Sequence, residues 1–292
     1  MVLDLSKGRL VVGSEPKTTL ERLLAGAGSR PLIGSNLISG GPEWTELCGN
    51  AGFDFVCVDQ MVSAMSWQET SEMLRAAAAG KTSGWVRLSA YPWGGSDQRA
   101  FLQRDVLKAI AMGAEAILAS VDNAQDAAAL VAMPEAHIRH RKYAVRGRGA
   151  DGIVPAGLPS IIPLIESDNA LAKLTQFASI SALEAVFMGV GDLARLKGVA
   201  ADIRDPQMAG VLRDAVNVCS QMGVTVMCST GRSDTLDEIL TSVEMLLGHR
   251  HQGHMGRQPF AYCFQSVPDD HGSYSLGCRR HASLRRGGEL LA

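Results

Sequence analysis

Residues 161–166 read IIPLIE and residues 185–192 read AVFMGVGD, so two apolar runs each end at an acidic residue, Glu166 and Asp192. Parallel strands that are covered on both faces are apolar throughout, and each run therefore predicts a buried strand. Between them, residues 167–179 place apolar side chains at helical spacing behind Ser167, a residue type that caps helices. The order strand, helix, strand puts both carboxylates at the carboxyl ends of neighbouring parallel strands.

Two carboxylates at one edge of a sheet have a specific chemical use. Divalent ions such as Mg²⁺ and Mn²⁺ prefer oxygen ligands, and Glu166 and Asp192 would supply two of them. The alternative is that both are ordinary acidic residues of a loop or of the first turn of a helix, where a negative charge is stabilising. The residues alone leave both interpretations open.

Strand and helix patterns alternate along most of the chain. Further strands are predicted at residues 32–37, 53–58, 85–88, 116–120 and 224–228, and helices at 19–27, 42–50, 67–78, 98–112, 124–132, 206–222 and 234–247. This repetition predicts a (β/α)8 TIM barrel preceded by an N-terminal helix. A doubly wound open sheet is the competing architecture, because residues 189–194 read GVGDLA and match the dinucleotide-binding pattern GxGxxA. No strand with an acidic end follows at the required distance, which favours the barrel.

The domain organisation follows from this pattern. Residues 1–29 form an N-terminal segment and helix, residues 30–248 the barrel, and residues 249–292 an atypical C-terminal tail. Five of the seven histidines lie in that tail, and HRHQGH stands at residues 249–254, where an apolar eighth strand is expected. Three interpretations remain open: a metal-binding histidine cluster, a divergent and partly disordered tail, or a reading-frame shift in the gene.

Composition excludes several classes of protein. The chain has 292 residues, of which 46% are hydrophobic, enough for one large core. Its net charge of −2 gives no electrostatic reason to expect nucleic acid or an anionic membrane as a partner. No apolar run approaches the roughly 20 residues of a membrane helix, and the first residues lack the apolar stretch of a signal peptide. Six cysteines without a CxxC pair favour a reduced, cytoplasmic protein.

The predicted strand ends bring further polar residues to the mouth of the barrel, where TIM-barrel enzymes carry out their chemistry. These residues are Asp59, Arg87, Ser120 and Cys228. Arg87 interrupts an apolar strand, where a charge is costly unless it is paired. Its guanidinium would hold a carboxylate or an enolate oxygen through paired hydrogen bonds. The alternative is a structural ion pair with a neighbouring strand-end acid.

Several motifs together resemble the HpcH/HpaI class II pyruvate aldolases. They are IESDNA at residues 165–170, FMGVGDL at 187–193 and AGFDF at 51–55, with Val58-Asp59, Val86-Arg87, Gly113-Ala114 and Asp122-Asn123-Ala124. The resemblance covers roughly residues 18–248. It implies a phosphoenolpyruvate/pyruvate barrel in which Glu166 and Asp192 hold Mg²⁺ or Mn²⁺. It also implies that amides around Gly191 and Asp192 bind the carboxylate of a 2-oxo acid, that Arg87 steadies the enolate oxygen, and that the protein is a homo-oligomer.

The chain departs from the aldolase pattern at the acid/base machinery. Residues 59–62 read DQMV, so Val62 replaces the histidine that transfers a proton in the family, and Ala111 replaces the aspartate that supports that histidine. Leu164 replaces a substrate-binding glutamine. Retro-aldol cleavage needs a base, whereas decarboxylation of a β-keto acid does not.

These departures shape the predicted function. It is a divalent-metal-dependent carbon–carbon lyase that acts on small 2-oxo acids through a pyruvate enolate, and the missing base favours a decarboxylase-like reaction or an enolate-using synthase. One alternative is a true pyruvate aldolase with a relocated base, for which His137, His140 and Tyr143 are candidates. The other is a non-catalytic barrel that binds a metal and a keto acid.

Overall fold

The computed structural model describes residues 2–4, 9–11, 18–27, 31–88, 96–136, 158–230, 241 and 261–266. Two short strands, β1 (Val2–Asp4) and β2 (Arg9–Val11), pair in an antiparallel sheet ahead of the main fold. No helix in these residues is both long and apolar enough to cross a membrane.

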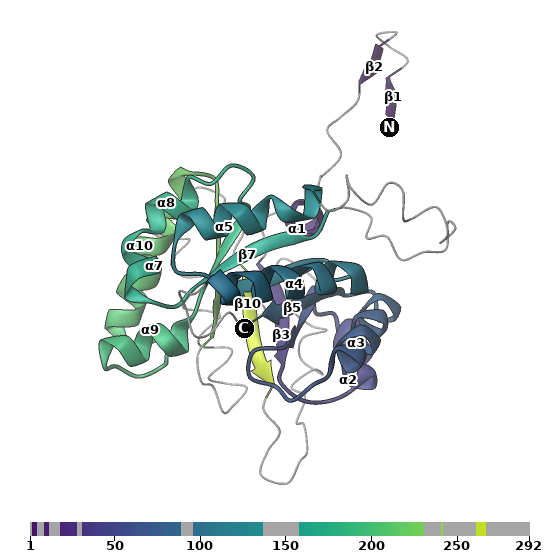
Figure 1. The fold of residues 1–292 in the computed structure, drawn as a ribbon, viewed down its shortest axis with the longest axis horizontal. Coiled ribbons are helices and arrows are strands. Elements are labelled where there is room, and N and C mark those ends of the chain that lie inside the picture. Colours follow the sequence, from purple (N-terminus) through teal and green to yellow (C-terminus); the bar gives the residue numbers. More distant parts are fainter. Residues whose placement is uncertain are drawn as a thin grey trace, which may run out of the picture.

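Eight parallel strands close into a barrel, which confirms the predicted (β/α)8 fold (Figure 1). The strands are β3 (Leu32–Leu37), β4 (Phe55–Asp59), β5 (Ser83–Leu88), β6 (Ala116–Ser120), β7 (Ser160–Ile165), β8 (Ala185–Met188), β9 (Thr225–Ser229) and β10 (Ala261–Ser266). They neighbour one another in chain order, and β10 closes the ring by pairing with both β9 and β3. All carboxyl ends therefore lie at one mouth of the barrel.

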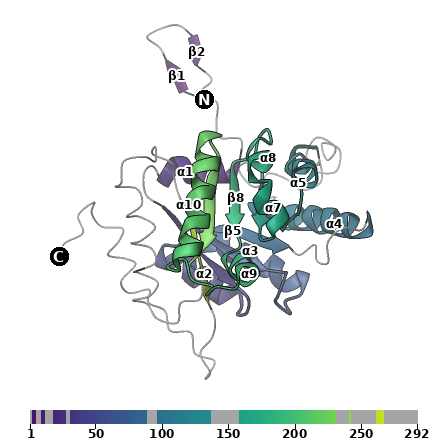
Figure 2. The ribbon, with the colours of Figure 1, turned by 90° about the vertical axis from the view of Figure 1, so that its left-hand side faces the viewer.

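Helices surround the strands (Figures 1 and 2). They are α1 (Thr19–Ala27), α2 (Pro42–Ala51), α3 (Trp67–Ala79), α4 (Ser96–Met112), α5 (Ala124–Val131), α7 (Asp168–Ala172), α8 (Leu174–Ala178), α9 (Val190–Lys197) and α10 (Pro206–Gln221). The predicted N-terminal helix is confirmed. The helix expected within residues 167–179 is divided at Lys173 into α7 and α8, although Ser167 caps its start as predicted. The helix predicted at 234–247 lies outside the described residues, except for Thr241.

Alternation along the strands separates an inner from an outer apolar layer. The inner cluster includes Phe55, Trp85, Leu118 and Leu164, and the Phe55 and Trp85 rings stack with their centroids 3.8 Å apart. Gly34 makes room for this stack, because a Cβ at that position would lie 2.2 Å from the Phe55 ring. Residues one position along, such as Val56, Val86, Ile117 and Val186, belong to the clusters that pack against the helices. The next inward position after the last inner apolar residue of a strand, such as Trp85, Leu118 or Leu164, therefore reaches the mouth of the barrel.

Two predicted boundaries differ from the structure. The second apolar run is not a strand as far as Gly191: β8 ends at Met188, and α9 begins at Val190. The eighth strand does not follow Gly248 but lies at Ala261–Ser266, so the barrel includes this part of the stretch that the sequence analysis sets apart as a tail.

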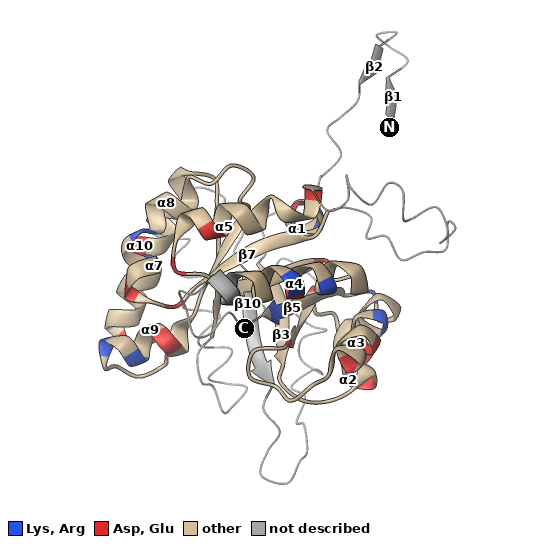
Figure 3. Cartoon of the chain, viewed as in Figure 1, with Lys and Arg blue, Asp and Glu red and all other residues tan. Residues whose placement is uncertain are grey.

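Charged residues lie mainly on the helices, whereas the strands are mostly uncharged (Figure 3). Acidic and basic residues are interspersed, in keeping with the small net charge. The acid and base groups at the strand ends are therefore exceptions to the apolar composition of the barrel.

Candidate active site

A layer of polar side chains follows the apolar interior at the carboxyl ends of five neighbouring strands. Asn36, Asp59, Arg87, Ser120 and Glu166 take successive inward positions at the ends of β3 to β7. Each lies two residues beyond an inner position of its own strand, and alternate residues of a strand share a face. The structure thus brings the predicted strand-end residues Asp59, Arg87, Ser120 and Glu166 to one edge.

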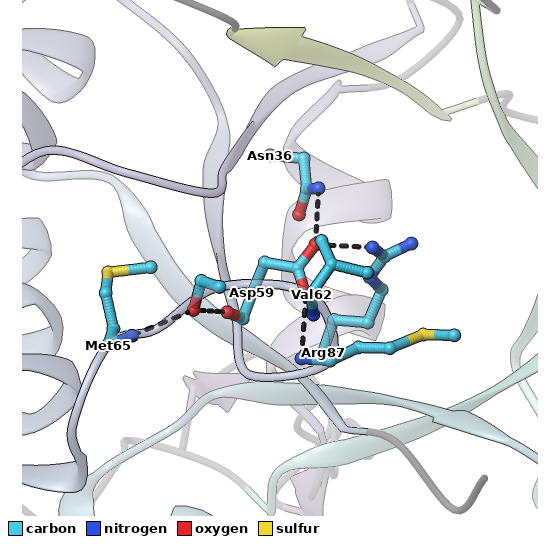
Figure 4. A network of polar contacts seen from close by, with 7 residues as sticks. Asn36, Asp59, Val62, Met65 and Arg87 are labelled. Carbon is cyan, nitrogen blue, oxygen red and sulfur yellow. Dashed lines mark hydrogen bonds and ion pairs between the residues drawn. The ribbon is translucent and has the colours of Figure 1, made fainter. Parts of the chain in front are cut away.

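Asp59 is the centre of a hydrogen-bond network in this layer (Figure 4). Its side chain is fully buried. One oxygen, Oδ1, accepts from the amides of Met61 (2.8 Å) and Val62 (3.1 Å). The other, Oδ2, accepts from Asn36 Nδ2 at 3.0 Å and from the guanidinium of Arg87. One carboxylate therefore fixes both the turn after β4 and the arginine of β5.

Arg87 is held as a cation in this environment. Burial alone would lower its pKa, but the adjacent Asp59 carboxylate raises it, Glu166 adds to that effect, and the pKa is raised overall. Its Nε is buried and has no hydrogen-bond partner in the part of the chain that the structure describes. A buried donor without a partner is costly, and a ligand oxygen would satisfy it. The ion pair between Arg87 and a strand-end acid is therefore confirmed. The role of Arg87 in binding a substrate oxygen stays a prediction.

Glu166 follows the last residue of β7 and is 5% exposed. Its Oε1 accepts a hydrogen bond from Ser120 at the end of β6. Its other side packs against Gly189, where a Cβ would lie 2.8 Å from Glu166 Cβ and 3.4 Å from Oε2. A glycine is thus needed at residue 189 for the glutamate to occupy this place.

Asp192 lies in the first turn of α9 rather than at the end of a strand. Gly189 connects β8 to this helix, so the helix start lies next to Glu166. The Asp192 side chain is 33% exposed and accepts from Arg195 Nη1 at 2.7 Å. Exposed pairs of this kind are weak, so the carboxylate remains able to bind a cation. Gly191 is exposed, and a Cβ built there meets nothing within 4 Å.

The donor set suits a divalent ion that keeps several non-protein ligands. No group of three or more His, Cys, Asp or Glu side chains able to hold a metal occurs in the described residues. Mg²⁺ is commonly bound through one or two carboxylates, with water and substrate oxygens completing the shell. Glu166 and Asp192 fit that type of site and do not form an all-protein cage.

Comparisons with known proteins find aldolases among the relatives of this chain. No family model matches the sequence. The 2-dehydro-3,6-dideoxy-6-sulfogluconate aldolase of Pseudomonas putida is 27% identical over 66% of this chain and 76% of its own length. The hydroxypyruvate/pyruvate aldolase of Sagittula stellata is 24% identical over 61% of this chain and 70% of its own length.

A solved structure supports the fold. It is an HpcH/HpaI aldolase/citrate lyase family protein of Burkholderia cenocepacia J2315, with a TM-score of 0.60 and 22% identity, over 84% of this chain and 91% of that one. The chain thus resembles aldolases in sequence and shares the fold of an HpcH/HpaI aldolase/citrate lyase family protein. The two relatives that match in sequence are both aldolases.

The residues that depart from the aldolase pattern lie in different parts of the barrel. Val62 is 61% exposed on the loop after β4, at the mouth. Ala111 lies in the last turn of α4, near the amino end of β6. A strand length of about 15 Å separates these two ends, so side chains at the two positions do not meet within one chain. Leu164 is buried in the inner apolar cluster.

Some residues were missed or misplaced by the sequence analysis. Asn36 was not singled out, because only the strand register shows that it lies on the inward face with Leu32 and Gly34. Cys228 lies in the outer cluster, away from the polar layer, and burial raises the pKa of its thiol to about 12. It therefore stays a neutral, structural thiol. The candidate bases His137, His140 and Tyr143 lie outside the described residues.

Proposed function

We propose that this chain is a divalent-metal-dependent carbon–carbon lyase that acts on small 2-oxo acids through a pyruvate enolate, and that decarboxylation is favoured over aldol cleavage. This proposed activity is more specific than the resemblance to aldolases. The observation that carries the proposal is that the buried carboxylate of Glu166 lies at the same mouth as the partly buried guanidinium of Arg87. The buried Nε of that guanidinium has no partner among the described residues. A site for an anion and a site for a cation thus share one mouth.

Each residue has a defined task in this proposal. Glu166 and Asp192 would hold Mg²⁺ or Mn²⁺, which would act as a Lewis acid toward a chelated 2-oxo acid. Arg87, kept charged and immobile by Asp59, would donate Nε–H to the oxygen on which negative charge develops. The amides of Gly191 and Asp192 belong to the first turn of α9, where N–H groups lack intrahelical partners and suit a substrate carboxylate.

The missing base determines which reaction is favoured. In decarboxylation of a β-keto acid such as oxaloacetate, the bond to the leaving carboxylate breaks, CO₂ departs, and the electron pair forms the enolate. A proton from solvent then converts the enolate to pyruvate, so no residue has to remove a proton first. Aldol cleavage requires a base for the substrate hydroxyl, and Val62 offers none at the position used by the family.

The decisive experiment measures oxaloacetate decarboxylation and pyruvate-releasing aldol cleavage with Mn²⁺, Mg²⁺ or EDTA. Decarboxylation is expected to depend on the ion and to fall by about 100-fold or more in Glu166→Gln and Asp192→Asn, together with Mn²⁺ affinity. Glu184→Gln is the matched control, because Glu184 is a partly buried glutamate at the opposite end of the barrel. Unchanged metal dependence in Glu166→Gln would contradict the proposed site.

A second prediction concerns Val62. Val62→His places an imidazole where the family has one, and 61% exposure of Val62 means that the change disturbs no core packing. Aldol cleavage should rise by up to about 100-fold, with decarboxylation nearly constant, since general-base catalysis typically contributes on this scale. Val62→Asn is the control for polarity without a base. If the unchanged protein cleaves aldols as fast as it decarboxylates, a base exists elsewhere and the preference for decarboxylation is wrong.

A further inference from the structure

We infer that Ser120 is a positioning residue that sets the orientation of the Glu166 carboxylate toward the bound ion; this rests on the proposed function. Ser120 is the last residue of β6 and is 1% exposed, and Glu166, 5% exposed, follows β7. Ser120 pairs with Leu164 across the two strands, so Ser120 and Glu166 lie on the same inner face. The serine hydroxyl donates to Glu166 Oε1.

The hydroxyl restrains the terminal torsion of the Glu166 side chain. The terminal carboxylate torsion of glutamate has a broad energy profile, so packing alone does not define the plane of the two oxygens. With Oε1 bound to Ser120, Oε2 lies on the side of Gly189, 3.4 Å from the position that a Cβ there would take. Gly189 leads directly into α9 and Asp192. The serine therefore turns one oxygen toward the second proposed ligand.

Neighbouring hydrogen bonds hold the segments that carry Ser120 and Glu166 next to each other. Ser167 Oγ donates to Asp122 Oδ1 at 2.5 Å, and Asn169 Nδ2 donates to the Asp122 carbonyl at 2.9 Å. These bonds tie the segment one to three residues beyond Glu166 to Asp122, two residues beyond Ser120. The Ser120–Glu166 hydrogen bond is thus one of three that connect the ends of β6 and β7, and the distance between these ends does not depend on the Glu166 side chain alone.

Loss of such a supporting hydrogen bond has a characteristic cost. Removal of a residue that orients a metal-binding side chain typically lowers metal affinity or activity by about 10- to 100-fold. We expect Ser120→Ala to weaken Mn²⁺ binding by about this factor, and Ser120→Thr, which keeps the hydroxyl, to restore most of it. Ser120→Cys has a similar size but only a weak hydrogen-bond donor, so its Mn²⁺ affinity should be close to that of Ser120→Ala. It replaces the alanine variant in the test if that variant fails to fold.

The chain supplies a matched control. Ser160, the first residue of β7, donates to Glu184 Oε2 at 2.7 Å. A hydrogen bond from a serine to a glutamate therefore also exists at the amino end of β7, opposite to the end that Glu166 follows. Ser160→Ala should leave Mn²⁺ affinity within about twofold of the unchanged protein, an order-of-magnitude bound well below the expected loss at Ser120. An equal loss of affinity in both alanine variants would overturn the inference, because it would indicate a general loss of stability.

Two measurements separate this inference from the proposed function. Mn²⁺ titration followed by electron paramagnetic resonance gives the affinity without turnover, and a crystal structure of metal-free Ser120→Ala shows whether the Glu166 carboxylate has rotated. If Glu166→Gln abolishes Mn²⁺ binding while Ser120→Ala binds as the unchanged protein does, Ser120 has no positioning role. If Glu166→Gln itself binds Mn²⁺ normally, the metal site is wrong, and a rotated Glu166 in the metal-free crystal would still establish the contact.

Discussion

Asp59 controls two parts of the mouth because its two oxygens bind different segments. Oδ1 accepts from the amides of the turn that carries Val62, and Oδ2 accepts from Asn36 and Arg87. The turn is also closed by Ser63, whose hydroxyl donates to the Asp59 carbonyl. The position of the arginine and the shape of the loop therefore depend on one buried carboxylate.

Removal of that carboxylate should be costly. Asp59→Ala leaves the Arg87 cation, whose side chain is 20% exposed, without its countercharge, and breaking a buried pair in this way costs about 3 kcal/mol or more. Urea unfolding of the variant measures the loss. Arg195→Ala provides the comparison, because it breaks the exposed Asp192–Arg195 pair and should cost less than about 1 kcal/mol. Similar losses in the two variants would contradict the assigned role of burial.

The sequence predicted the charged residues of this layer but not all of the neutral ones. Charge inside an apolar strand is conspicuous, and this feature identified Arg87 and the strand-end acid Asp59. Asn36 and Ser120 are polar residues at the ends of buried strands, and in such strands both faces are apolar, so the sequence does not reveal which alternate set faces inward. Only the register of neighbouring strands places Ser120 beside Glu166.

At the scale of elements, the predictions succeeded where the end signals are strong. Ser66 and Glu69 form a capping box at α3, and Asp205 with Pro206 begins α10, so both helices start where they were predicted. The boundary after β8 was missed because α9 opens with the small and apolar residues 190–191, which extend the pattern of the strand. The backbone leaves the strand at Gly189, and the apolar run alone does not indicate that change.

The close contact between α2 and the end of α3 makes Gly49 sensitive to substitution. A Cβ at Gly49 would lie 2.3 Å from the carbonyl oxygen of Gly80, and backbone atoms yield less readily than a side chain. Gly49→Ala should therefore lower the free energy of unfolding by about 1–3 kcal/mol. Gly210 lies inside α10, and a Cβ added there would meet nothing within 4 Å, so Gly210→Ala should instead stabilise by about 0.5–1 kcal/mol. Thermal unfolding of both variants checks the opposite signs.

For the whole molecule, the two ends of the barrel have different tasks. At the amino ends of the strands, Glu184 accepts from Thr18 Oγ1 at 2.5 Å and from Ser160 Oγ at 2.7 Å, which links the start of α1 to β7. The alternation of strands and helices predicted this architecture, but the sequence did not reveal β10. That strand lies beyond a polar stretch, whereas the prediction expected it directly after Gly248.

The amino end should show a specific dependence on pH. Burial raises the pKa of Glu184 above its ordinary value of 4.5, although its hydrogen bonds to Thr18 and Ser160 act in the opposite direction. Below the ordinary value, the group is protonated in both states. Between the ordinary and the raised value, only the folded state keeps the proton, so the free energy of unfolding should fall as pH rises through this window. Glu184→Gln should flatten that fall in urea unfolding measured from pH 4.5 upward, and parallel curves would contradict the assignment.

Closure of the barrel by β10 also sets an order of events during synthesis. β3 pairs with β10 over the whole of its length, from Leu32 with Ala261 to Leu37 with Ser266, and these segments stand at opposite ends of the barrel sequence. At roughly 5–20 residues per second, the nascent chain exposes one unpaired edge of β3 for on the order of ten seconds or more before its partner leaves the ribosome. An open strand edge is a template for pairing with another chain. Premature termination before residue 261 would therefore yield a product with two permanent open edges, at β3 and β9, that is prone to aggregate.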